Sequence, residues 1–443
     1  AMSVRLIAAV FCCLSLAACS TDAFDWLGEP PPPPLEGERI AVLEFETELR
    51  GDSGLADLPV VLPPPIPTPN WPQYGGLIDK AMHHIAAPGP LDEIWSRDIG
   101  EGTGRFRKLI ATPVVALGRV FTFDADTEVS AFDVATGESL WDFDVEPEYE
   151  DDGGWGGGLA FYRGRLYVTT GYGELIMLDH ETGEEYWRVR IGPPIRTPPT
   201  VSQGRVYLVT SDNELVALDA DTGEVLWSHR GLEELAGLLG GGSPAVSASI
   251  VVVTYSSGEI YALRAENGRV VWADTLAYSA RLGSLAALND INGSPVIDRG
   301  LVYAVSHSGR LVAIDLASGG RLWERDISGV QTPWIAGDYL YVITTDGFVV
   351  CLFREDGRIR WVSGLPQFED PEDRDGPIHW SGPVLAGDRL LVAGTNGMAA
   401  AVSPYTGEIL GMVDLGSGLP LSPVVASETV FFIEGSGEII ALR

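Results

Sequence analysis

A motif of nine residues recurs along most of the chain and constrains its fold more than any other feature. The motif reads Asp-x-x-Thr-Gly-x-x-x-Trp, and its clearest copies begin at Asp133, Asp179 and Asp219. With four weaker copies included, the turn glycines lie 46, 40, 45, 51, 38 and 50 residues apart: Gly137, Gly183, Gly223, Gly268, Gly319, Gly357 and Gly407. Repeats of this length are typical of β-propellers, in which each blade is a sheet of four strands.

Each repeat contains signals for four short strands joined by tight turns. Residues 204–210 and 214–219, for example, are predicted to be the second and third strands of one blade, followed by the Thr-Gly turn and the Trp strand. In the turn, the Asp or Thr side chain can accept hydrogen bonds from backbone N–H groups, while Gly adopts a positive φ that other residues resist. The Trp then stands at one fixed place per blade, where we expect it to bury on the order of 200 Å² against the neighbouring sheet.

The last repeat indicates how the ring of blades closes. Residues 422–425, 429–432 and 438–442 supply three strands, and no Trp strand follows them. Residues 93–100 resemble the other Trp strands closely, so they are expected to complete this blade and to remove an exposed sheet edge. The sequence therefore predicts an all-β fold over residues 93–443, an eight-bladed β-propeller of four-stranded antiparallel blades whose last blade is closed by an N-terminal strand.

The N-terminal residues resemble the signal peptide of a bacterial lipoprotein. The apolar run 6–16 is too short to span a bilayer as a stable anchor. It leads into Leu-Ala-Ala immediately before Cys19, which resembles the lipobox at which a cysteine is acylated. We therefore expect residues 1–18 to be removed and Cys19 to carry the lipid, the alternative being an ordinary signal peptide with a chance cysteine.

The next segment, residues 19–92, is rich in proline. Its runs at 30–34 and 63–69 favour extended polyproline II structure, which acts as a spacer. Residues 40–45 could form one strand, but nothing nearby in the sequence offers a partner. The predicted organisation is a signal peptide, a lipid-anchored proline-rich tether over residues 19–92, and a propeller over residues 93–443.

Charge and the placement of reactive side chains argue against several classes of function. Lys and Arg number 29 against 62 Asp and Glu, and the formal charge of −33 is opposite to that of a nucleic-acid-binding protein. The six histidines fall in different segments, and His83 with His84 is interpreted as a solvated pair in a linker. The acidic stretch 146–152 lacks the ligand ladder of a calcium loop, and the glycine run 153–158 lacks the Lys of a phosphate loop. The sequence thus predicts no catalytic, cofactor-binding or metal-binding residue.

The repeats resemble those of eight-bladed quinoprotein dehydrogenases, which hold pyrroloquinoline quinone and a calcium ion on the propeller axis. Those enzymes carry two adjacent cysteines that form a disulfide beside the cofactor. Here the only adjacent pair, Cys12 and Cys13, lies in the expected signal peptide, and Cys351 alone remains in the folded part. The chain therefore resembles the non-catalytic branch, with a periplasmic quinone-dependent dehydrogenase kept as the alternative function.

The lipobox, the proline-rich tether, the eight blades and the end at a third strand together resemble the BamB family of lipoproteins, which belong to the outer-membrane β-barrel assembly machinery. Residues 71–76 also resemble the segment before the first blade in this wider family. The resemblance implies a scaffold without a cofactor, anchored by lipid in the outer membrane and facing the periplasm. Its implied partners are the periplasmic POTRA domains of the central barrel subunit, BamA, and unfolded outer-membrane protein clients. A third interpretation is a sensor or other interaction propeller unrelated to barrel assembly.

Two expanded connections between blades form the predicted partner surface. They span residues 231–242 and 277–292, and both carry leucines at helical spacing. If the loops fold back onto their own blades, they are caps. If they lie exposed, adjacent loops make one apolar patch with Arg281 and Asp290 at its rim, which is the usual anatomy of an interface.

The resemblance to the BamB family sharpens this prediction. In that family, the loops entering these two successive Ser-Pro strands contact BamA. Placing the loops by their Ser-Pro anchors assigns Leu238 and Leu239 to the first contact and Asp290 and Asn292 to the second. An Arg expected in the first loop is Leu239 here, and Arg281 is the candidate to replace it.

Overall fold

The computed structural model describes residues 49–55, 58–149, 154, 156–232, 242–276 and 293–443. Residues 1–18, which are the expected signal peptide, Cys19, which is expected to carry the lipid, and the unassigned residues 40–45 lie outside these ranges. Within the described ranges, no helix is long and apolar enough to cross a membrane, and the single helical element is the 3-10 turn η2 (Ser53–Leu55). The compact unit formed by residues 50–443 is built from strands.

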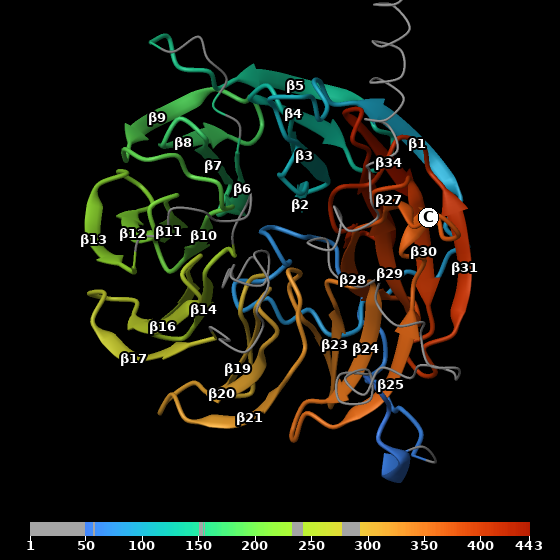
Figure 1. Cartoon of the computed structure of the whole chain (residues 1–443). Helices are drawn as coiled ribbons and strands as arrows, with labels where there is room; N and C mark the ends of the chain where they lie inside the picture. Colours follow the sequence, from blue (N-terminus) through green and yellow to red (C-terminus); the bar gives the residue numbers. More distant parts are fainter. Residues whose placement is uncertain (1–48, 56–57, 150–153, 155, 233–241, 277–292) are drawn as a thin grey trace, which may run out of the picture. The chain divides into compact units, whose positions relative to one another are not determined.

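Eight four-stranded antiparallel sheets stand around one axis as the blades of a propeller, which confirms the predicted fold (Figure 1). The strands are given from the axis outward. Blade 1 comprises β2 (Val114–Ala116), β3 (Arg119–Phe123), β4 (Glu128–Asp133) and β5 (Ser139–Asp144); blade 2, β6 (Gly157–Tyr162), β7 (Arg165–Thr170), β8 (Glu174–Asp179) and β9 (Glu185–Arg190); blade 3, β10 (Thr200–Ser202), β11 (Arg205–Val209), β12 (Glu214–Asp219) and β13 (Val225–Arg230); and blade 4, β14 (Ala245–Ser247), β15 (Ile250–Thr254), β16 (Glu259–Arg264) and β17 (Val270–Thr275).

The second half of the ring continues in the same order. Blade 5 comprises β18 (Val296–Asp298), β19 (Leu301–Val305), β20 (Leu311–Asp315) and β21 (Arg321–Arg325); blade 6, β22 (Trp334–Ala336), β23 (Tyr339–Ile343), β24 (Phe348–Phe353) and β25 (Ile359–Gly364); blade 7, β28 (Trp380–Ala386), β29 (Arg389–Gly394), β30 (Met398–Val402) and β31 (Ile409–Asp414); and blade 8, β32 (Val424–Ala426), β33 (Thr429–Ile433), β34 (Glu438–Leu442) and β1 (Glu93–Asp98). A small hairpin, β26 (Phe368–Asp370) with β27 (Asp375–Pro377), lies between blades 6 and 7 in the sequence.

The turn chemistry predicted from the motif is present. The Asp133 carboxylate accepts hydrogen bonds from the backbone N–H groups of Ala135 and Thr136, both at 2.9 Å, and Gly137 has a φ of 67°. The same arrangement recurs at Asp179, whose carboxylate accepts hydrogen bonds from the N–H groups of Glu181 and Thr182. These local hydrogen bonds fix the turn before each Trp strand.

Each motif Trp joins its own blade to the next blade. The ring of Trp141 lies against Gly183 of blade 2, where a Cβ would come within 2.6 Å of the indole. The indole Nε1 of each motif Trp donates to a backbone carbonyl of the following blade: Trp95 to Val134, Trp141 to His180, Trp187 to Asp221, Trp227 to Ala265, Trp272 to Leu316, Trp323 to Arg354, and Trp361 to Pro404. The turn glycine is therefore required twice, for its φ and for the space that the indole occupies. Blade 7 departs from the expectation of one Trp per blade, because Gly411 stands at its position.

The ring closes as the sequence predicts. Strand β1 pairs antiparallel with β34, with Trp95 opposite Ala441 and Asp98 opposite Glu438. The backbones of Asp92 and Arg443 exchange two hydrogen bonds of 3.0 and 2.9 Å at the end of this pair. In Figure 1, the blue β1 accordingly lies beside the red β34.

The segment before β1 differs from the expected free spacer, since residues 66–89, called the axial segment below, pack inside the ring. Their backbone and side chains hydrogen-bond to the inner part of every blade. Taken from blade 8 through blades 1 to 7, the contacts are Thr68 with Ser427, Trp71 with Val115, Pro72 with Phe161, Gln73 with Val201, Ile78 with Val246, Asp79 with Ile297, His83 with Trp334, and Ile85 with Gly387. Proline-rich extended chain suits this role, because its backbone groups are not used internally and can pair with the edges of the innermost strands.

A buried ion pair connects blades 5 and 6 near the axial segment. The guanidinium of Arg354 contacts the carboxylate of Asp298 and donates to the Asp298 carbonyl at 3.1 Å and to the Tyr303 hydroxyl at 3.1 Å. His83 Nε2 lies 3.5 Å from the same carboxylate. Burial alone would raise the pKa of Asp298, but hydrogen bonds from His83 and Arg354 lower it to about 2.

Candidate functional site

The predicted contact residues lie outside the described part of the chain, but the bases of both loops are described. These predicted residues are Leu238, Leu239, Arg281, Asp290 and Asn292. A Cβ at Gly242, which ends the first loop, would lie 2.9 Å from the carbonyl oxygen of Gly293, which ends the second. The loops entering blades 4 and 5 therefore lie close together at the residues that end them.

The base of the first loop is held by polar side chains with no exposed surface. Ser243 precedes β14, and its Oγ lies 2.8 Å from Oγ1 of Thr200 on blade 3. Lys80 of the axial segment donates from Nζ to Thr200 Oγ1 at 3.2 Å, to Ser243 Oγ at 3.4 Å and to the Tyr74 carbonyl at 2.8 Å. The axial segment thus fixes where the first loop ends.

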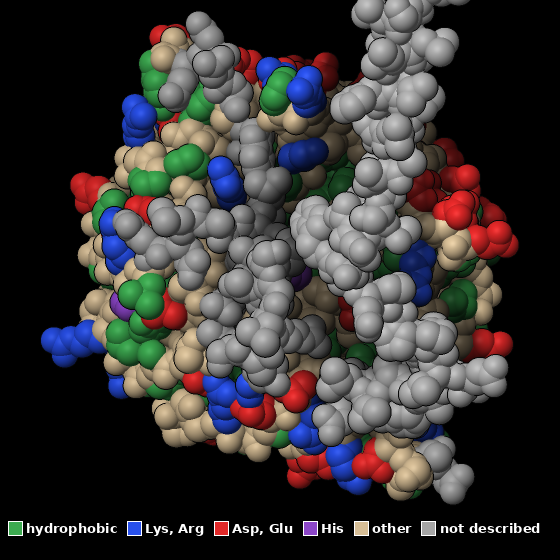
Figure 2. Space-filling view, viewed as in Figure 1, with side chains coloured by type: hydrophobic (Ala, Val, Ile, Leu, Met, Phe, Trp, Pro, Cys, Tyr) green, Lys and Arg blue, Asp and Glu red, His purple; other side chains and the backbone are tan. Residues whose placement is uncertain are grey.

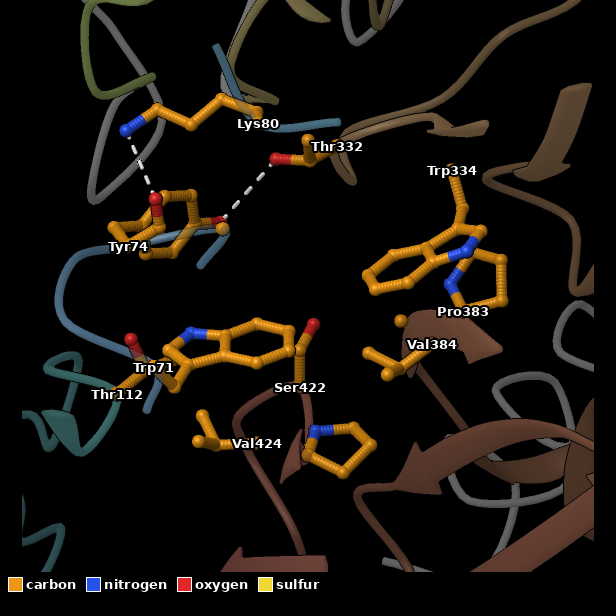
Figure 3. A pocket seen from close by; sticks show the side chains of 13 residues that line it. Trp71, Tyr74, Lys80, Thr112, Thr332, Trp334, Pro383, Val384, Ser422 and Val424 are labelled. Atoms are coloured by element: carbon orange, nitrogen blue, oxygen red, sulfur yellow. Dashed lines mark hydrogen bonds between the residues drawn. The ribbon is translucent and has the colours of Figure 1, made fainter. Parts of the chain in front are cut away.

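The same segment reaches the base of the second loop. The backbone N–H of Ser294 donates to Thr332 Oγ1 at 3.0 Å, and the Tyr74 hydroxyl lies 3.4 Å from the same oxygen (Figure 3). The sequence prediction did not include Lys80 or Tyr74. The only signal near them was the family-like segment 71–76, which marked the place without indicating its role.

We expect the stability of the protein to rise with pH because of the Lys80 amine. Burial lowers the pKa of Lys80 to about 7, against 10.5 in an unfolded chain, although the charge of Asp79 opposes the shift. Between these values the unfolded state binds more protons, so raising the pH favours folding, by about 2 kcal/mol from pH 7 to pH 9. In Lys80→Met this gain should be absent when melting temperatures are compared at the two pH values. An equal pH dependence in both proteins would contradict this assignment.

Two cavities among the described residues lie near the propeller axis and are lined in part by the axial segment. The inner one has a volume of only about 40 Å³ and lies beside Trp71 and Trp334, whose rings stack 6.2 Å apart at 18° (Figure 3). The outer one, about 370 Å³, is lined on its polar side by Lys108, Arg196 and Gln331.

These spaces do not fit a quinone with calcium. A drug-sized ligand needs a pocket of roughly 300 to 1,000 Å³, and the inner space is far smaller. Calcium needs several oxygen ligands that usually include carboxylates, yet no Asp or Glu is among the residues that line either space. The donor set therefore does not suit the cofactor of the quinoprotein dehydrogenases.

Two histidines and the cysteine of the described chain lie where they stabilise the fold. His84 is buried and lies 2.8 Å from the Pro63 carbonyl, so the interpretation of His83 and His84 as a solvated pair is wrong; the axial segment buries one ring and pairs the other with Asp298. Cys351 is a buried free thiol in β24, and burial raises its pKa. Within the described ranges, no group of three or more His, Cys, Asp or Glu side chains could hold a metal ion.

Comparison with solved structures agrees with this fold. BamB from Moraxella catarrhalis superposes with a TM-score of 0.66 at 20% identity, over 80% of this chain and 99% of that one. A quinohemoprotein alcohol dehydrogenase from Comamonas testosteroni gives a TM-score of 0.63 at 15% identity, over 84% and 80%. At these identities both likenesses concern the fold alone.

Sequence comparison identifies the family. Outer membrane protein assembly factor BamB of Shewanella oneidensis is 27% identical over 353 residues, which is 78% of this chain and 87% of the relative. The same factor of Moranella endobia is 23% identical over 357 residues, 79% of this chain and 89% of the relative. A family model described as outer membrane protein assembly factor BamB matches residues 125–363, just over half of the chain. This chain therefore belongs to the BamB family of outer membrane protein assembly factors.

Proposed function

We propose that this chain is a non-catalytic scaffold of the outer-membrane protein assembly machinery. Membership of the BamB family supports the assembly role. The axial spaces argue against the dehydrogenase, because the inner one is too small for a quinone and neither offers a carboxylate to calcium. The observation that carries the proposal furthest is the meeting of Gly242 and Gly293 at the bases of the two expanded loops. Because the two loops lie close together at these residues, one partner can contact both.

The proposed partner is the set of periplasmic POTRA domains of a BamA-like central barrel subunit. The first loop would contribute Leu238 and Leu239, and the second Arg281, Asp290 and Asn292. An interface with such domains needs apolar side chains buried at its centre and charged side chains at its rim. The loops are long and apolar enough to supply both.

Leu238→Ala/Leu239→Ala and Asp290→Lys test this surface by co-purification with the central barrel subunit. Both variants are expected to keep the wild-type melting temperature. The double leucine variant should lose roughly thirtyfold in affinity, because truncating a central apolar anchor costs about 2 kcal/mol. Asp290→Lys should also weaken binding, because it reverses a charge at the rim. Leu226→Ala is the matched control, since Leu226 is 46% exposed near the start of β13 on blade 3, close to the Thr-Gly turn. A lowered melting temperature with unchanged capture would mean that the leucines are caps, and full capture by folded variants would remove this surface as the site.

The chain is also proposed to be anchored in the outer membrane by lipid on Cys19, with the propeller in the periplasm. The lipobox-like residues before Cys19 support this placement. Cys19→Ser removes the acylated thiol, so the variant should move from the membrane pellet to the soluble periplasmic fraction. Continued pelleting of the variant with the membranes would contradict the lipid anchor.

A further inference from the structure

Blade 7 lacks the side chain that fills the same place in every other blade. In register, Gly411 of β31 lies opposite Ala401 of β30, which lies opposite Leu391 of β29. The other seven blades have a Trp where blade 7 has Gly411: Trp95, Trp141, Trp187, Trp227, Trp272, Trp323 and Trp361. A Cβ added at Gly411 would meet no described atom within 4 Å.

The space left by the missing indole is a groove between blades 7 and 8. Its volume is about 510 Å³, and its apolar lining includes Leu391, Ala401, Phe432, Leu442 and Leu91. Blade 8 has no Thr-Gly turn at this point, because the backbones of Asp92 and Arg443 pair there instead. The groove therefore lies where the ring closes.

The strand beside the groove is an unusually apolar edge. All six residues of β31 are exposed, and its large apolar side chains are between 37% and 53% accessible: Ile409, Leu410, Met412 and Val413. Asp414 at its end is the sole charge, and β31 has no further partner strand among the described residues. Soluble proteins normally protect such edges with charges, prolines or covering segments, because an open edge pairs with other chains.

From this geometry we propose that β31 and its groove bind an extended segment of an unfolded outer-membrane protein client. The segment adds a fifth strand to blade 7 and lays an aromatic side chain over Gly411. This inference rests on the proposed function for the identity of the client, and it names the surface and the side chain that recognise it.

The seven equivalent positions argue for an aromatic occupant. In each of them an indole, presented by the outer strand, fills the space between two blades and donates to a carbonyl of the next blade. An aromatic residue on a neighbouring strand can cover a glycine in the same way from across the pair. Main-chain hydrogen bonds to the free edge supply affinity without sequence preference, and the groove supplies the preference for an aromatic ring.

The chemistry of the client suits both elements. Strands of outer-membrane barrels alternate apolar and polar residues and carry girdles of aromatic side chains at the membrane interfaces. A second copy of this chain is the less favourable occupant, because each copy carries a formal charge of −33 and acidic side chains gather on the rim near β1 and β31 (Figure 2).

The test uses the full chain and a labelled peptide of about twelve residues in which Thr and Val alternate around one central Trp, with Lys at both ends. A second peptide has Ala at the centre. Fluorescence anisotropy should show the Trp peptide binding the wild type at least about tenfold more tightly than the Ala peptide. In Gly411→Trp the protein fills its own groove, so the two peptides should bind equally.

Edge pairing is tested with Leu410→Lys, which places a charge on the strand at the side of the groove and leaves Gly411 unchanged. Binding of both peptides should weaken. The matched control is Leu226→Lys in β13, because Leu226 also precedes the outer-strand Trp position and is similarly exposed. Wild-type binding by Leu410→Lys, or the same Trp preference in Gly411→Trp, overturns the proposal; so does a dimer of the wild type that Leu410→Lys disperses.

Failure of this inference is distinguishable from failure of the proposed function. Capture of the central barrel subunit depends on the loops at blades 4 and 5, so Gly411→Trp should leave it unchanged. If capture is intact and the Trp preference is absent in the wild type, the groove proposal alone is wrong. If capture is absent and the Trp preference is present, the groove binds strands as proposed and the scaffold function is wrong.

Discussion

Trp95→Ala is expected to lower the free energy of unfolding by about 3–5 kcal/mol, because the indole is buried where the ring closes. Its Nε1 donates to the Val134 carbonyl at 3.2 Å, and its ring fills the space beside Gly137. The centroid of its ring also lies 5.8 Å from that of Phe431 in β33, the strand on the other side of β34. Denaturant unfolding followed by far-UV circular dichroism measures the change without relying on tryptophan fluorescence.

Ile94→Ala is the matched control for this prediction. Ile94 precedes Trp95 on the same strand and is 41% exposed, so its truncation should change the stability by no more than about 0.5 kcal/mol. If Trp95→Ala is as stable as Ile94→Ala, then β1 does not hold the ring closed.

Arg354→Met should destabilise the protein by a similar amount, about 3–5 kcal/mol, because it leaves the Asp298 carboxylate without its main partner. Arg354 is buried between blades 5 and 6, and the substitution also removes donors to the Tyr303 hydroxyl and to two carbonyls. Thermal unfolding at pH 7 gives the comparison. The control is Arg358→Met, since Arg358 forms an exposed pair with Asp356 whose loss should cost less than about 1 kcal/mol.

The ion pair between Arg354 and Asp298 also predicts how the stability of the protein changes in acid. The pKa of Asp298 is about 2 in the folded protein and near 3.8 in an unfolded chain. Its contribution to stability is therefore complete above pH 4 and is lost as the pH falls toward 2. In Arg354→Met the hydrogen bond and charge of Arg354 no longer lower the pKa of Asp298, so this acid-dependent loss of stability should be smaller or absent. The same acid profile in both proteins would contradict a role for this ion pair.

The propeller was predictable because its signals are local and repeated. Asp133, Thr136 and Gly137 specify a turn by themselves, and the spacing between copies counts the blades. The closing strand was also predictable, since Trp95 belongs to the same pattern as the other Trp strands. In both cases the local residue choice and the global fold agree, so that each repeat is evidence for the others.

The axial segment and the buried polar groups were not predictable in this way. Proline runs indicate extended chain, but they do not say whether that chain is solvated or packed against strand edges. Lys80 and Arg354 differ in no local feature from surface residues, and their burial depends on partners 120 and 56 residues away, Thr200 and Asp298. The open position at Gly411 likewise becomes visible only when the blades are compared in register.

The axial segment changes how the propeller should respond to local damage. A chain of repeats that touch only their neighbours can unravel unit by unit, and its stability is roughly a sum of local terms. Here one strip of polypeptide, residues 66–89, hydrogen-bonds to all eight units at once. Opening any single blade breaks a hydrogen bond to the axial segment, which also contacts the other seven blades. We therefore expect the eight blades to unfold in one cooperative transition. The strip is synthesised before any unit that it touches, and its contact with Ser427 forms only after nearly the whole chain has been made. The full set of contacts between the axial segment and the eight blades can therefore form only after nearly the whole chain has been made.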